Sequence, residues 1–141
     1  MNVPSPSIPR SRRVLVGGFG LVWNLVGLAM FAMQVSMSPD TLAAMPEAQR
    51  AVYAATPMWI NVVFGIAVAS GVIGSIGLLM GRRWAATALL VSLIAIVVQM
   101  VGAYAVTPAW AASGAGGLVL PVLLMVIAFG LWRYALRARV R

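Results

Sequence analysis

Few side chains in this sequence can take part in catalysis. Asp40 and Glu47 are the only acidic residues, and the chain contains no histidine and no cysteine. Hydrolytic or transfer chemistry needs an activated nucleophile, a base or a metal ion. Histidine is the commonest general base and metal ligand, and cysteine supplies a thiol nucleophile or a thiolate ligand. The two carboxylates are seven positions apart in one polar stretch, where we expect them to be solvated. We therefore expect no enzyme activity, no metal site and no cofactor.

The uncharged polar residues are more informative, because they recur at helical spacing inside apolar runs. The first polar stripe is Gly17, Gly20, Asn24, Gly27, Phe31 and Gln34. The second, 68 positions later, is Ala85, Ala88, Ser92, Ala95, Gln99 and Gly102. Alternating spacings of three and four residues place each set on one helix face. The opposite faces carry bulky apolar residues such as Val22 and Ile94, a pattern typical of membrane helices that pack against one another.

Two interpretations of these polar residues remain open. The candidates are Asn24, Gln34, Asn61, Ser92 and Gln99. They either form hydrogen bonds between helices, or they line a small outward-facing pocket for a neutral solute where the two stripes face each other, with Trp23 or Tyr104 beside it. Proton-coupled transport is not favoured, because no apolar span contains an ionisable side chain.

Composition indicates an all-α integral membrane protein. Of 141 residues, 62% are hydrophobic and 9% charged, and the mean hydropathy is +1.00. Soluble domains carry about 25% charged residues. The net charge of +8 comes entirely from arginines at the ends of apolar runs, which points to lipid headgroups and topology and argues against nucleic acid. The expected partner is the lipid bilayer.

The apolar runs predict a four-helix transmembrane bundle within residues 14–136. The expected spans are about 14–37, 57–81, 84–106 and 118–136, with tails 1–13 and 137–141 and an external loop 38–56 that includes a short amphipathic helix. Thr56 and Pro57 are expected at the N-cap and first position of the second span. An alternative fourth span begins near Pro108 and kinks at Pro121.

Several residues are assigned to packing and to the membrane interface. Small residues expected at helix contacts are Gly17, Gly20, Gly27, Ala67, Gly71, Gly74, Ala88 and Ala95. Tryptophans expected at headgroup depth are Trp59, Trp84 and Trp110. The motif Thr-Pro-x-Trp occurs at 56–59 and again at 107–110. Either the chain consists of two related hairpins, or similar interfacial demands produced the same motif twice.

Arginine placement predicts the orientation. Nine arginines fall on the side of the N-terminus: Arg10, Arg12, Arg13, Arg82, Arg83, Arg133, Arg137, Arg139 and Arg141. Arg50 alone falls on the other side, together with both acids. The positive-inside rule then places both termini on the cytoplasmic side. The expected membrane is a bacterial inner (plasma) membrane.

The sequence also resembles a known family. The residues concerned are Trp23-Asn24, Gln34, Pro57-x-Trp59, Gly71-x-x-Gly74, Leu78-Leu79, Arg82-Arg83, Ser92-Leu93 and Gln99. They are similar to a family of small four-span bacterial membrane proteins that are often labelled sugar transporters, over about residues 20 to 100. The resemblance implies a neutral polyhydroxyl solute and assigns no binding residues.

Two functions are therefore carried forward. The first is an accessory or assembly subunit that packs through its glycine- and alanine-rich faces against a second copy or a larger membrane complex. The alternative is an oligomeric facilitator for a small neutral solute such as a sugar, oligomeric because four short spans rarely enclose a path.

Overall fold

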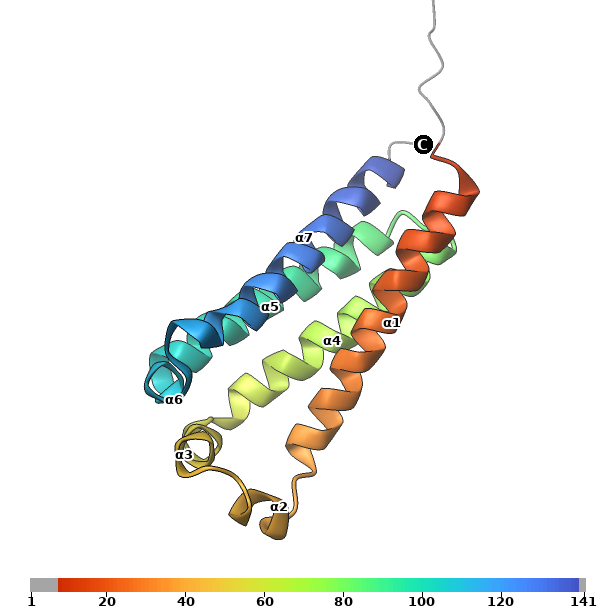
Figure 1. Cartoon of the computed structure of the whole chain (residues 1–141). Helices are drawn as coiled ribbons and strands as arrows, with labels where there is room; N and C mark the ends of the chain where they lie inside the picture. The colour runs from red at the N-terminus through yellow and green to blue at the C-terminus, as the bar shows by residue number, and fades with distance from the viewer. Residues whose placement is uncertain (1–7, 140–141) are drawn as a thin grey trace, which may run out of the picture.

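The computed structural model describes residues 8–139 and shows four long antiparallel helices (Figure 1). These are α1 (Arg10–Val35), α4 (Met58–Leu79), α5 (Ala85–Val106) and α7 (Val119–Arg139). Each lies in a helical segment that is long and apolar enough to cross a membrane, and the described residues form no strand. The predicted all-α, four-helix transmembrane bundle is confirmed.

The first helix is longer at its start than the sequence indicated. It begins at Arg10, directly after Pro9, so Arg10 to Arg13 form its first turn, although the sequence placed them in a tail. A polar, arginine-rich turn is compatible with a helix end outside the hydrocarbon core. Residues 1–7 of the expected tail lie outside the described part of the chain.

The loop between the first two spans contains two short helices, α2 (Pro39–Ala43) and α3 (Glu47–Ala55). The Ser38 hydroxyl caps α2 by accepting a hydrogen bond from the backbone N–H of Thr41 at 3.2 Å. Pro46 immediately precedes α3. Its fixed φ and missing N–H separate the single amphipathic helix expected here into two.

The assignment of Thr56 as the N-cap of the second span is wrong. Its hydroxyl donates to the carbonyl of Val52 at 2.8 Å, so it belongs to the end of α3, and Pro57 directly precedes α4. Thr107 makes the equivalent bond to Ala103, at 2.6 Å, at the end of α5. The two Thr-Pro-x-Trp motifs therefore share the same local structure as far as the proline.

After the second motif the chain differs. Two short elements, α6 (Ala109–Ser113) and the 3₁₀ helix η1 (Gly114–Leu118), come before α7. Gly114 has φ of +56°, a left-handed conformation that ends α6. The last span therefore begins at Val119, close to the expected 118. Pro121 falls in its first turn, where no backbone hydrogen bond is required. The apolar helical segment as a whole runs from Ala109 to Ala138, so its start agrees with the alternative that begins near Pro108, but its irregular part is the 3₁₀ helix η1 and not Pro121.

The helices pack in the order α1–α4–α5–α7, with α4 and α5 forming the most extensive interface. Because α1 and α7 touch only sparsely, the bundle is closed on three sides and open on the fourth. Figure 1 shows α1 and α7 approaching each other at one end and diverging towards the other. We call the first the arginine end and the second, formed by α2, α3 and α6, the loop end.

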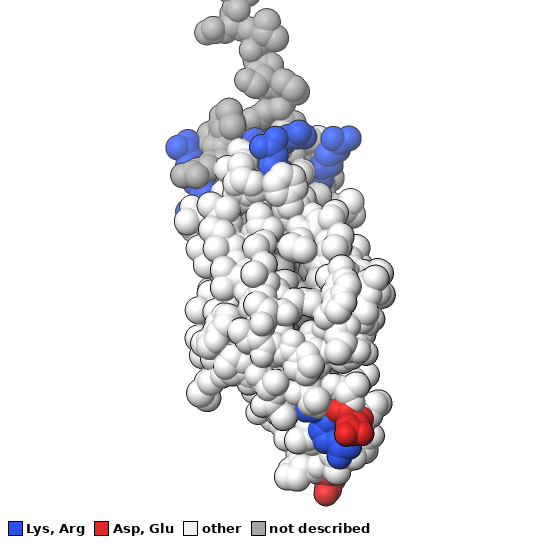
Figure 2. Space-filling model, turned by 90° about the vertical axis from the view of Figure 1, so that its left-hand side faces the viewer, with Lys and Arg blue, Asp and Glu red and all other residues white. Residues whose placement is uncertain are grey.

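The two ends differ in charge and in packing. Figure 2 shows arginines gathered at one end and both acids, with a basic residue beside them, at the other. A cluster of buried residues closes the bundle towards the arginine end; it consists of Leu78, Ala85, Ala86, Leu89, Leu131 and Ala135. Trp84 starts α5 at the arginine end, while Trp59 and Trp110 lie at the loop end. All three tryptophans are about half exposed, as expected for side chains at a membrane interface.

Candidate functional site

The first polar stripe packs against α4. The amide nitrogen of Asn24 donates to the carbonyl of Gly20 at 2.8 Å and to the hydroxyl of Ser75 on α4 at 3.5 Å. Ser75 is fully buried and in turn donates to the carbonyl of Gly71. Gly17 and Gly20 bring α1 close to this part of α4. Asn24 is thus occupied in holding two helices together.

The second polar stripe packs against another face of the same helix. The hydroxyl of Ser92 on α5 donates to the carbonyl of Ala67 on α4 at 2.7 Å. Although α4 packs between α1 and α5, residues of both stripes line common cavities: Asn24 and Gln99 share one, and Gln34 and Gln99 share another. Asn24 and Ser92 also come together at Gly71 of α4.

The small residues assigned to packing mostly serve the bundle itself. The buried members are Gly17, Gly20, Ala67, Gly71, Gly74 and Ala95, while Gly27 and Ala88 are half-buried. A Cβ on Gly74 would lie 2.7 Å from Leu89 Cγ, and one on Gly27 would lie 3.2 Å from Val68. These positions admit neighbouring helices of the same chain. A surface for another protein has to lie elsewhere.

At the loop end the amides again connect helices. Gln34 donates to the side-chain oxygen of Asn61 at 2.7 Å, which joins α1 to α4. The hydroxyl of Tyr53 on α3 donates to the backbone carbonyl of Gln34 at 3.2 Å. Gln34 and Asn61 therefore join α1 to α4, and the backbone of Gln34 also holds α3 against the bundle.

Gln99 behaves differently from the other four candidates. It is half-buried on α5 and makes no hydrogen bond within the described part of the chain. Instead it lines two neighbouring cavities, an outer one of about 420 Å³ and an inner one of about 210 Å³. Met30 of α1 also lines both cavities, so the two lie side by side.

The cavities form a cleft that runs from the loop end to mid-depth. The outer part is lined by Met30, Met33, Gln34, Tyr53, Ile60 and Gln99 among others. The inner part is lined by Trp23, Asn24, Phe64, Gln99, Met100 and Leu124 among others. Beyond Trp23 it narrows to a space of about 10 Å³, the size of a single water, beside Leu89 and Leu131. These two leucines belong to the buried cluster, which closes the cleft towards the arginine end.

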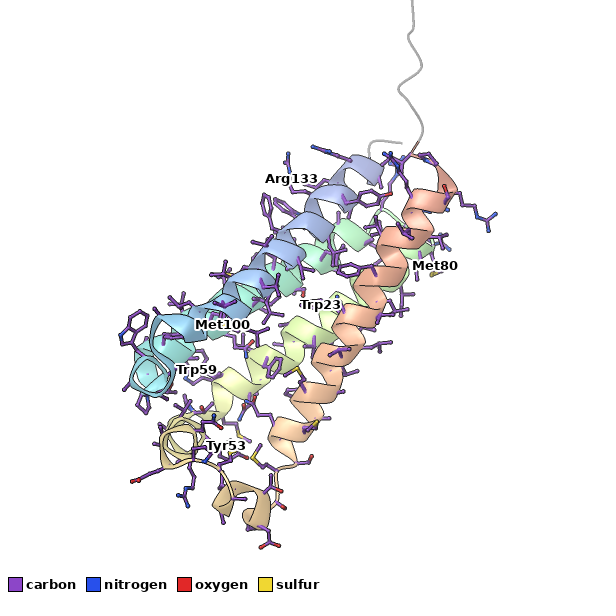
Figure 3. All side chains as sticks on the ribbon, viewed as in Figure 1. Trp23, Tyr53, Trp59, Met80, Met100 and Arg133 are labelled. Atoms are coloured by element: carbon purple, nitrogen blue, oxygen red, sulfur yellow. The ribbon has the colours of Figure 1, made fainter. Side chains whose placement is uncertain are left out.

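The position of the cleft can be followed in Figure 3. Tyr53 lies at the loop end, while Trp23 and Met100 lie further up the bundle, near the space between α1 and α7. The walls are mostly apolar, and methionines from α1, α5 and the loop contribute to them. Such surfaces adapt to ligands of varied shape because methionine is flexible and polarisable. A single unpaired amide among apolar walls suits a neutral molecule with one or two hydrogen-bonding groups.

Sequence reasoning found part of this site. Trp23 was expected beside a pocket and does line the cleft, whereas Tyr104 instead makes an edge-to-face contact with Trp110, with ring centroids 6.4 Å apart. Met30, Met100 and Leu124 were not recognised. The chain contains nine methionines, and their concentration in the first span and the following loop was the available signal.

Fold and cleft together define an all-α, multi-pass membrane protein with a lateral, mostly apolar cleft. No protein-family model, no curated protein and no solved structure matches the chain. The likeness to the four-span family labelled as sugar transporters accordingly stays a prediction.

Proposed function

We propose that this protein is a non-enzymatic membrane protein that takes a small, neutral, mostly apolar molecule into its cleft from the loop end. The observation that carries the proposal is Gln99, a half-buried side-chain amide that makes no hydrogen bond within the described chain and lines two adjacent cavities. A molecule bound there can form a hydrogen bond with this amide while its apolar part contacts the walls. No chemistry is assigned, because Asp40 and Glu47 are both exposed at the loop end.

The proposed setting is a bacterial inner membrane with both termini in the cytoplasm. Support comes from the charge asymmetry, because α1 begins and α7 ends among the arginines while both acids lie at the opposite end (Figure 2). In this orientation the cleft opens to the outside. Molecules reach it from the external medium or from the outer leaflet.

The lining narrows the class of molecule. A polyhydroxyl sugar needs many hydrogen-bonding partners in a desolvated site, and the inner cavity offers chiefly Gln99. An aromatic or short-chain molecule with one donor fits these walls better. Passage to the other side would further require Leu78, Leu89 and Leu131 to separate, so we propose binding as the basic activity and facilitated passage as an extension of it.

Cysteine labelling tests the proposal directly, because the natural chain contains no cysteine. A Met100→Cys variant, which keeps Gln99 and places the thiol in the inner cavity, is treated in liposomes with a membrane-impermeant thiol reagent, alone and with indole or glucose present. We expect the reagent to modify Cys at this position, indole to slow the modification and glucose to leave it unchanged. Ile94→Cys is the control, because Ile94 lies on the exposed apolar face of the same helix and should not react.

Absence of labelling at position 100 would show that the cleft does not communicate with water. Labelling that is equally fast with and without indole, and with other neutral apolar probes, would contradict the binding function. Protection by glucose instead of indole would favour a sugar as the ligand, as the family resemblance implies.

A second candidate is the accessory or assembly subunit, favoured by the open side of the bundle between α1 and α7. A helix of another chain placed there would cover Val26 and Met30, which line the cleft and are more than half exposed. Mass measurement in mild detergent separates the two candidates. If the protein is a monomer and indole protects Met100→Cys from the reagent, the binding function is supported. If it forms a stable complex in which Met100→Cys no longer reacts, assembly is supported.

A further inference from the structure

A separate cavity lies at the arginine end, on the far side of the buried cluster from the cleft. Its volume is about 210 Å³, and Arg13, Arg82 and Arg83 contribute to its wall. Leu78 and Ala135, two members of the buried cluster, form its apolar part. The cavity thus joins a basic rim to the hydrophobic interior of the bundle.

The turn between α4 and α5 shapes the basic wall. Gly81 has φ of +66° and ends α4 in a Schellman motif, with Arg82 N–H bonded to the Gly77 carbonyl at 2.8 Å and Gly81 N–H to the Leu78 carbonyl at 3.1 Å. A Cβ at position 81 would lie 2.6 Å from Nη1 of Arg13. The glycine therefore both permits the turn and makes room for the Arg13 guanidinium.

One donor of the Arg13 guanidinium lacks a partner among residues 8–139. Its Nε is buried and has no hydrogen-bond partner within the described chain. Both acidic side chains of the protein, Asp40 and Glu47, are at the opposite end of the bundle, as Figure 2 shows. A partly desolvated guanidinium with an unpaired donor is unfavourable unless an anion is supplied from outside.

We propose that this cavity binds a phosphate group, with Arg13 and Arg82 as its principal ligands. The guanidinium of arginine offers donors in a fixed fork that matches phosphate oxygens, and two arginines from separate elements can hold one phosphate from two sides. Basic pockets between transmembrane helices at the membrane surface are typical sites for anionic lipid headgroups. The apolar wall at Leu78 and Ala135 adds a surface on which an acyl chain can lie. The inference does not depend on the function proposed for the cleft.

Native mass spectrometry of the detergent-solubilised protein tests the site with phosphatidylglycerol, and thermal unfolding tests it with inorganic phosphate. We expect the wild type to retain phosphatidylglycerol, and Arg13→Gln to reduce retention about tenfold, as loss of a charge-assisted hydrogen bond predicts. Arg12→Gln is the matched control, because Arg12 is exposed on the same helix turn, lies outside the cavity wall and carries the same charge. It should change retention less than twofold, roughly the effect of an exposed charge.

The two measurements show whether the bound phosphate belongs to a lipid or is free inorganic phosphate. Retention of the lipid without any stabilisation by inorganic phosphate assigns the site to a lipid headgroup, and a response to both assigns it to the phosphate group itself. If Arg13→Gln does not fold, lipid retention is compared between the wild type and Arg82→Gln. Arg82 is exposed, so its replacement should not affect folding. Equal retention by the wild type, Arg12→Gln and the cavity variants would overturn the proposal, as would failure of the wild type to respond to either ligand.

Discussion

The side-chain amide of Asn24 on α1 occupies the space in which a side chain on Gly71 of α4 would have to lie. A Cβ at position 71 would come within 2.6 Å of Asn24 Cγ and 3.1 Å of the Ser92 hydroxyl. Asn24 cannot move aside without breaking its bonds to Gly20 and Ser75. One glycine thus permits α1, α4 and α5 to meet near the middle of the bundle.

Gly71→Ala should therefore destabilise the protein. We expect a loss of about 1–3 kcal/mol, the usual cost of forcing an extra carbon into a packed site. The measurement is thermal unfolding in detergent followed by circular dichroism. Gly130→Ala is the control, because no heavy atom lies within 4 Å of a Cβ at that position. Alanine is the better helix former, so this control should unfold at the same or a higher temperature, and an equal loss in both variants would contradict the packing argument.

Asn24→Leu should also lower stability, for a different reason. The variant keeps the volume of the side chain but removes the hydrogen bonds to Gly20 and Ser75. We expect a cost of about 1 kcal/mol, near the value found for polar contacts between membrane helices. The same unfolding measurement applies. No change in unfolding temperature would show that the amide does not hold the helices together.

Gln99→Leu should leave stability unchanged within about 0.5 kcal/mol, because this amide makes no hydrogen bond to the described protein. Binding in the cleft should weaken about tenfold, as loss of a buried hydrogen bond to a ligand predicts. Met100→Cys in the inner cavity serves as the labelling site for this comparison, with indole as the protecting molecule. If indole protected the thiol equally well in the Gln99→Leu background, the Gln99 amide would not contribute to binding.

Leu124→Trp should block the cleft by filling the inner cavity of about 210 Å³, which Leu124 lines. Indole should then no longer protect Met100→Cys, while the unfolding temperature stays equal or rises because empty space is filled. Leu123→Trp is the neighbouring control, since Leu123 is exposed on the apolar surface and outside the cleft wall. Loss of protection in both variants would indicate a general disturbance of α7.

Much of the fold could be predicted from the sequence, because apolar runs and arginine positions determine where spans begin and end. The expected third span at 84–106 differs from α5 by one residue at its start, and the expected start of the last span differs from that of α7 by one. Local chemistry caused the errors. The Thr56 hydroxyl donates to a carbonyl of the preceding helix α3 and so does not cap α4. The polar residues Arg10 to Arg13 belong to the first turn of α1. Hydropathy indicates neither feature.

The candidate site was less predictable, because a stripe identifies the inner face of a helix but not the neighbour that it meets. Asn24 and Ser92 were correctly placed on inner faces, yet both contact α4. The cleft results from the divergence of α1 and α7, which depends on the whole bundle. Asn24, Gln34 and Gln99 all line that cleft, but of these only Gln99 makes no hydrogen bond within the described part of the chain.

The sparse contact between α1 and α7 has a consequence for the rate at which the cleft exchanges its contents. Met30 and Met100 line the inner cavity, and the few contacts between α1 and α7 leave this side of the bundle without a covering helix. Flexible side chains change rotamer within picoseconds to nanoseconds where they are exposed, whereas collective helix movements take microseconds to milliseconds. Molecules should therefore enter and leave this cleft on the timescale of side-chain motion, and methionine substitutions should alter the rates of association and dissociation more than the affinity.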